Sequence, residues 1–248
     1  MTSVAIYSYS IAALAFLLLT FLLLTSWRGR MHGTALTVAS ALTVLWSVVV
    51  AWQASAHDAL WAWTGALEIV RNGAWSVFLL ILLGRWQKPD STLPFRLNPS
   101  LLPVAGFYLV FLLVTVAAEW DIGLGESLGV LPSVVARVGM AVLGMLLVEQ
   151  LYRNKPVQER WAIKFACLGI GGMFAYDFYL YSHAMLFREV DPDIWAARGV
   201  INALTVPLLA LSMRRAKSWR SPLAVSRRAM FHSAALFGSA IYLLAMGS

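Results

Sequence analysis

The chain has 248 residues, of which 60% are hydrophobic and 12% are charged, and its mean hydropathy is +0.73. A soluble domain carries roughly twice that charged fraction, so the composition excludes a soluble globular protein and indicates an integral membrane protein. The net charge of +7 does not indicate a nucleic-acid partner, because the basic residues lie in short loops and no zinc spacing, phosphate loop or RNA-binding signature is present. The single cysteine, Cys167, excludes an intrachain disulfide.

Apolar segments follow one another along the chain and predict an all-α, polytopic transmembrane helical bundle. The first segment, Val4 to Trp27, has about 24 residues, which is enough to span a bilayer. It begins without a basic residue, so we interpret it as a retained helix rather than a cleavable signal. Gly169, Gly171 and Gly172 predict close approach of a neighbouring helix. We expect about eight spanning helices, at residues 4–27, 34–55, 60–83, 101–118, 131–152, 161–186, 194–213 and 229–247.

Lys and Arg residues are concentrated in alternate loops. Fourteen of the 19 follow the first, third, fifth and seventh predicted helices, whereas the loops between them are mostly acidic. Cytoplasmic loops of membrane proteins are enriched in Lys and Arg, so we expect the N-terminus outside the cell. With eight helices Ser248 would also lie outside, and the last helix ends without a basic anchor. We therefore interpret residues 1–248 as one transmembrane domain and expect a further helix after it.

Polar and charged residues interrupt four of the predicted helices. In residues 60–83, the spacing of Glu68, Arg71, Asn72 and Trp75 places all four on one helical face, where Glu68 and Arg71 can pair. The other three helices carry Arg137, then Asp177 with Tyr181, and then Arg198 with Asn202 and Trp195.

A charge within the hydrocarbon region is costly and marks a candidate functional site. All these residues lie in the outer half of the membrane or near its middle, so we expect their helices to enclose one polar cluster. Three arginines face only two carboxylates, and the surplus positive charge suits an anionic ligand or an acidic partner. The alternative is that the residues are interhelical ion pairs that only fix helix register. The candidate ligand or signal site consists of Glu68, Arg71, Asn72, Arg137, Asp177, Tyr181, Arg198 and Asn202.

No nucleophile with a base, no His-rich zinc helix and no paired-aspartate protease motif occurs in the sequence. We therefore predict no catalytic residue, no metal site and no cofactor in these residues.

Several stretches resemble the membrane region of the PrsK-type sensor histidine kinases of the PEP-CTERM/exosortase system. The resemblance covers most of the chain and is densest from residue 148 onward. The matching stretches are residues 68–75 (EIVRNGAW), 148–154 (VEQLYRN), 174–182 (FAYDFYLYS), 193–199 (DIWAARG), 202–204 (NAL), 225–228 (VSRR) with Phe231 and His232, and 242–246 (YLLAM).

The resemblance implies a multi-pass sensory domain in a bacterial inner membrane. In that family a further helix, a GAF-type module and a kinase core follow. The kinase uses ATP and Mg²⁺, is a homodimer, and passes a phosphate to a response regulator that controls exopolysaccharide and PEP-CTERM genes. No phospho-acceptor helix or ATP-binding glycine box occurs in these 248 residues. The leading hypothesis is the input domain of such a kinase. The alternative is a small-molecule transporter or another ligand-binding membrane protein, for which Pro207 is a possible helix break.

Overall fold

The computed structural model describes residues 2–26, 31–56, 61–83, 101–119 and 131–215. These residues form seven helices and no strand, which confirms the all-α class. Six of the described helices are long and apolar enough to cross a membrane, and α4 contains a shorter apolar stretch, Pro103–Val114. The helices are α1 (Thr2–Ser26), α2 (Met31–Ala56), α3 (Trp61–Leu82), α4 (Leu101–Glu119), α6 (Leu131–Asn154), α7 (Val157–Phe187) and α8 (Pro192–Arg215).

The predicted helix boundaries agree with the structure to within about three residues, apart from the start of α7. We expected that helix at residue 161, but it begins at Val157, after an extended Pro156 whose carbonyl accepts the backbone N–H groups of Glu159 and Arg160. Its first turn is polar, so the apolar pattern did not include it. The eighth predicted helix, 229–247, lies outside the described residues, as do the loops 84–100 and 216–228.

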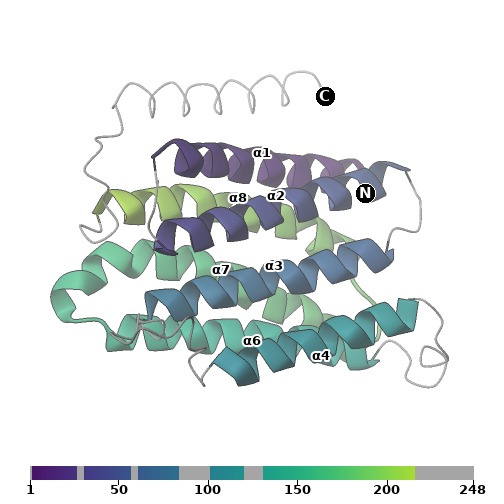
Figure 1. Cartoon of the computed structure of the whole chain (residues 1–248). Helices are drawn as coiled ribbons and strands as arrows, with labels where there is room; N and C mark the ends of the chain where they lie inside the picture. Colours follow the sequence, from purple (N-terminus) through teal and green to yellow (C-terminus); the bar gives the residue numbers. More distant parts are fainter. Residues whose placement is uncertain (1, 27–30, 57–60, 84–100, 120–130, 216–248) are drawn as a thin grey trace.

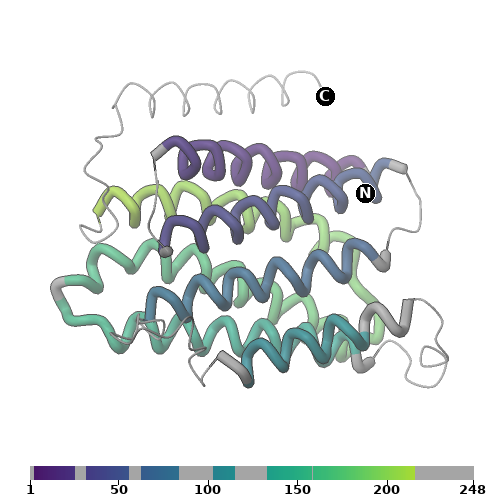
Figure 2. Tube along the Cα trace, viewed as in Figure 1, coloured from purple at the N-terminus to yellow at the C-terminus, as the bar shows by residue number. Residues whose placement is uncertain are grey.

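Six helices form a closed ring. Helix α1 packs against α2 and α8, α2 packs against α3, α3 against α6, α6 against α7, and α7 against α8. Helix α4 lies outside this ring and contacts α3 and α6. The helices run side by side in alternating directions (Figures 1 and 2). The ring therefore has an interior that all six helices share.

The two ends of the bundle differ in charge. The end where α6 passes into α7 and where α8 finishes carries Arg153, Lys155, Arg160, Arg214 and Arg215 (Figure 1, left). We call it the basic end. The opposite end, where α7 finishes and α8 begins, carries Arg188, Glu189, Asp191 and Asp193, and we call it the acidic end.

The bundle is apolar on its outside as well as in its core. The largest core cluster includes Phe16, Trp75 and Phe174 from three different helices. Outward-facing side chains such as Phe21 and Leu168 are more than 60% exposed. A soluble protein does not leave so many large apolar side chains in water. The helix lengths and this surface together identify a membrane protein whose helices contact lipid.

Helices α1 and α8 lie very close together at Gly199. A Cβ atom added there would lie 2.1 Å from Ser8 Oγ and 2.6 Å from the Ser8 carbonyl carbon. Gly199 is thus a close-approach glycine that the sequence did not reveal. Gly169 has the predicted role, because an added Cβ would lie 3.0 Å from Thr205 Cγ2. At Gly171 an added Cβ would lie 3.4 Å from Val148 Cγ1, which is an ordinary contact, and at Gly172 it would meet no described atom within 4 Å, so the prediction is wrong there.

Candidate functional site

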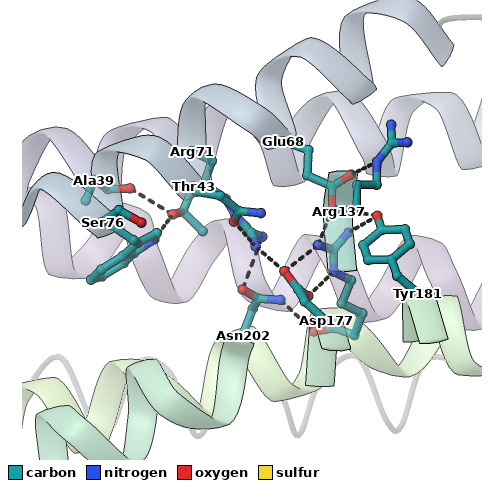
Figure 3. A network of polar contacts seen from close by, with 12 residues as sticks. Ala39, Thr43, Glu68, Arg71, Ser76, Arg137, Asp177, Tyr181 and Asn202 are labelled. Carbon is teal, nitrogen blue, oxygen red and sulfur yellow. Dashed lines mark hydrogen bonds and ion pairs between the residues drawn. The ribbon is translucent and has the colours of Figure 1, made fainter. Parts of the chain in front are cut away.

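The charged residues of four helices meet inside the ring, in the half nearer the acidic end. Glu68 lies seven residues into α3 and Arg198 lies six residues into α8, which places them roughly 10 Å from those helix ends. Asp177 lies ten residues before the end of α7, or about 15 Å. Figure 3 shows the side chains of Glu68, Arg71 and Asp177 turned toward one another. The structure thus brings the predicted residues into a single polar network.

Asp177 joins α7 to α3 and α8. Its two oxygens accept hydrogen bonds from Nε and Nη2 of Arg198, both at 2.7 Å, and Oδ2 also accepts one from Arg71 at 3.1 Å (Figure 3). Asp177 and Arg198 are each 1% exposed. A two-pronged arginine–carboxylate pair is the strongest geometry that these side chains can form. Asp177 faces protein rather than lipid.

Glu68 connects α3 to three other helices. Its Oε1 accepts hydrogen bonds from Arg198 and from the Tyr181 hydroxyl, each at 2.5 Å, and its Oε2 accepts one from Arg137 at 3.4 Å. The predicted pairing of Glu68 with Arg71 is therefore wrong. Glu68 and Arg71 each pair with residues of neighbouring helices instead. The spacing within α3 showed that the two side chains could meet, but not that residues of other helices would compete for them.

Arg71 completes the network on its other side. Its Nη2 donates to Asn72 Oδ1 at 2.9 Å as well as to Asp177, and its Nη1 donates to Asn202 Oδ1 at 3.3 Å. The Asn202 amide in turn donates to the Arg198 carbonyl at 2.8 Å. The guanidinium groups of Arg71 and Arg198 thus use all three of their nitrogens.

Two aromatic residues of α1 and α2 belong to the site, although the sequence analysis did not include them. The ring centroid of Trp46 lies 4.1 Å from Cζ of Arg71 and 4.8 Å from Cζ of Arg198. Tyr9 packs edge-on against Trp46 at 5.4 Å and donates its hydroxyl to the Trp195 carbonyl at 2.8 Å. Trp46 is 1% exposed at the middle of α2, far from the helix ends where interfacial tryptophans lie. This mid-helix position was the feature of the sequence that could have indicated a buried role for Trp46.

Trp75 and Trp195 were predicted on the same faces as the charged residues but make different contacts. Trp75 donates its ring N–H to Thr43 at 3.1 Å and packs in the apolar core. Trp195 contacts Tyr9, with ring centroids 4.9 Å apart.

Arg137 is the most exposed arginine of the cluster. Its side chain is 17% exposed, against 1% for Arg71 and Arg198. Nε makes the long bond to Glu68, and the two terminal nitrogens have no hydrogen-bond partner among the described residues. Figure 3 shows its guanidinium at the edge of the network. The surplus positive charge of the cluster is therefore located at Arg137.

The carboxylates and the hydroxyl of the cluster are all engaged in contacts within it. Both carboxylates are occupied by arginines, and the Tyr181 hydroxyl donates to Glu68. Within the described ranges, no three His, Cys, Asp or Glu side chains are grouped so that they could hold a metal ion.

No protein-family model matches this chain, and no curated protein or solved structure is detectably similar to it. The resemblance to PrsK-type kinases stays a prediction.

Proposed function

We propose that this chain is the membrane input domain of a signalling protein, and that its input is an anionic group bound at Arg137. The observation that carries the proposal is the difference in burial and hydrogen bonding among the three arginines of the cluster. Arg71 and Arg198 are buried and form hydrogen bonds through every guanidinium nitrogen. Arg137 is partly exposed at the edge of the network, and its two terminal nitrogens bond to no described residue. A partly exposed arginine at the margin of the network can bind an external anion at a lower desolvation cost than the two buried arginines.

The contacts of Glu68 supply a mechanism. One of its oxygens is bound to α7 and α8, through Tyr181 and Arg198. Among the described residues, the other oxygen is bound only to Arg137 of α6. An anion that takes Arg137 away from Glu68 leaves Glu68 with its other two partners. The Glu68–Arg137 ion pair between α3 and α6 is then broken while the rest of the network holds, which leaves the apolar contact between the two helices free to shift. A ligand with different affinity for these two packings shifts the population between them.

Topology gives this change a direction. With the N-terminus outside, the basic end faces the cytoplasm, and Arg137 lies in the outer half of the membrane. The connection between α6 and α7, at Lys155 and Pro156, lies at the opposite end. Movement of α6 would therefore carry an outer signal to the cytoplasmic side of a bacterial inner membrane.

The resemblance extends the proposal to the whole protein. The domain would control a homodimeric histidine kinase that uses ATP and Mg²⁺ and passes phosphate to a response regulator for exopolysaccharide and PEP-CTERM genes. A transporter is the alternative. Transporters of the best-known kinds bind substrate at discontinuous helices, whereas α8 runs unbroken from Pro192 to Arg215 through Pro207.

The kinase assignment is tested with the full-length protein in lipid vesicles. Incubation with ATP and Mg²⁺ should label the protein on histidine, and the acid lability of the label distinguishes it from serine or threonine phosphate. Folded protein that takes up no phosphate, together with vesicles that accumulate solute, would replace the kinase with the transporter.

A further inference from the structure

We infer that the basic end contains a binding site for the phosphate group of an anionic phospholipid, built from Lys164 of α7 and Arg215 of α8. This site lies at the opposite end of the bundle from the polar cluster and does not depend on the proposed signalling function.

Two aromatic rings hold the two cations together. Cζ of Arg215 lies 3.9 Å from the ring centroid of Trp161 and 4.5 Å from that of Phe165. Nζ of Lys164 lies 5.0 Å from each of the same two centroids. Like charges that share a pair of rings repel one another, and an anion between them removes that repulsion.

The end of α8 is fixed at this place. The Ser212 hydroxyl donates to the Ala162 carbonyl in the first turns of α7 at 2.8 Å, and Ser212 itself is fully buried. Arg215 follows it by three residues, so its side chain leaves α8 on the same side, toward α7. The cations are therefore positioned by packed helices rather than by a loop.

Neither cation has an acidic partner among the described residues. The two described acids of this end pair with other cations, Glu149 with Arg153 at 3.0 Å and Glu159 with Lys155 at 3.8 Å. No Asp or Glu occurs in the sequence after Asp193.

Arg215 also has an unsatisfied donor. Its Nη1 is buried without a hydrogen-bond partner, although the side chain as a whole is only partly buried. A buried donor without an acceptor is destabilising, so an incoming phosphate oxygen would be favoured here.

The surroundings favour a lipid over free phosphate. Trp161 is 58% exposed at the level of the cations, and Leu168, one turn beyond Lys164, is 63% exposed. Basic side chains at the end of the bundle, next to an apolar helix surface that runs toward the middle of the membrane, match a lipid head group and its acyl chains. An inorganic phosphate would contact only the basic side chains and not the apolar surface.

Native mass spectrometry of the full chain in detergent tests the site. Wild type should retain phosphatidylglycerol in preference to phosphatidylcholine, and Lys164→Gln with Arg215→Gln should weaken that binding about fivefold for each charge removed. Arg153→Gln is the matched control, because it removes an exposed, paired cation from the same end. Lys164→Arg keeps the charge and should bind as wild type does.

Three results would overturn the inference. The first is equal retention of the two lipids by wild type. The second is an equal loss of binding in the Arg153→Gln control. The third is inorganic phosphate without lipid raising the melting temperature of wild type as much as phosphatidylglycerol does.

Discussion

Asp177 is the residue on which the stability of the polar network depends most. Its carboxylate neutralises Arg198 and Arg71 at distances of 2.7 and 3.1 Å, inside a part of the bundle that excludes water. Two carboxylates already face three guanidinium groups there, so the network has no spare negative charge. Loss of the negative charge at Asp177 would leave Arg198 and Arg71 with Glu68 as the one carboxylate of the network.

Asp177→Asn should therefore destabilise the bundle by about 3–5 kcal/mol, since a buried charge is left unpaired. Arg198→Gln should also be destabilising, and the double variant should cost less than the sum of the two. Unfolding in detergent micelles measures these differences. Full additivity would show that the two side chains do not interact in the folded protein.

Trp46 should contribute through its contacts with two cations. Replacing it with Leu keeps an apolar side chain but removes the ring, and a cation–π contact in a desolvated place is worth about 2 kcal/mol. We expect Trp46→Leu to lower the melting temperature and Trp52→Leu, at an outward-facing tryptophan of the same helix that is 63% exposed, to leave it nearly unchanged. Equal effects of the two substitutions would refute a special role for Trp46.

At the scale of helices, the contact between α1 and α8 depends on Gly199. The Ser8 hydroxyl donates to the Ala196 carbonyl at 2.5 Å and the Tyr9 hydroxyl donates to the Trp195 carbonyl at 2.8 Å. These bonds need the two backbones to lie close together. The glycine permits this approach, and it brings Tyr9 against the cluster.

Gly199→Ala should push α1 away from α8 and cost about 1–3 kcal/mol, as overpacking of a tight contact does. The matched control is Gly172→Ala, where an added Cβ meets nothing within 4 Å and where the higher helix propensity of Ala should be neutral or stabilising. Thermal unfolding of both variants in micelles compares them. A Gly199→Ala protein as stable as wild type would contradict the close approach.

Helix faces were predictable because their periodicity is local, whereas helix partners were not. The spacing of Glu68, Arg71 and Asn72 correctly indicated a polar face turned toward Asp177 and Arg198. The same spacing wrongly suggested an ion pair between Glu68 and Arg71. Choosing between partners on one helix and partners on another requires the distances between helices, which a single sequence does not contain.

The contributions of α1 and α2 were missed for a related reason. Tyr9 and Trp46 lie in helices that contain no Asp, Glu, Lys or Arg, so no charged residue marked the helical face that turns toward the cluster. Gly199 likewise gave no signal, because its neighbour Ser8 is almost the whole chain away. The start of α7 was missed because its first turn is polar.

For the whole molecule, orientation in the membrane remains a prediction from the Lys and Arg distribution. Single cysteines at Ser127 and Ser218, introduced after replacement of Cys167, should separate the two sides. A membrane-impermeant reagent added to intact cells should label position 127 and leave position 218 unlabelled. Labelling of position 218 would reverse the topology and place Arg137 in the cytoplasmic half.

The central claim is that an anion at Arg137 is the input of a signalling domain. Arg137→Gln in the full-length protein tests it most directly, with signalling output measured beside the amount of folded protein in the membrane. Arg153→Gln, which removes an exposed cation at the other end, serves as the control. We predict altered output at normal abundance for Arg137→Gln and wild-type output for the control. Wild-type output from a normally abundant Arg137→Gln protein would contradict the claim.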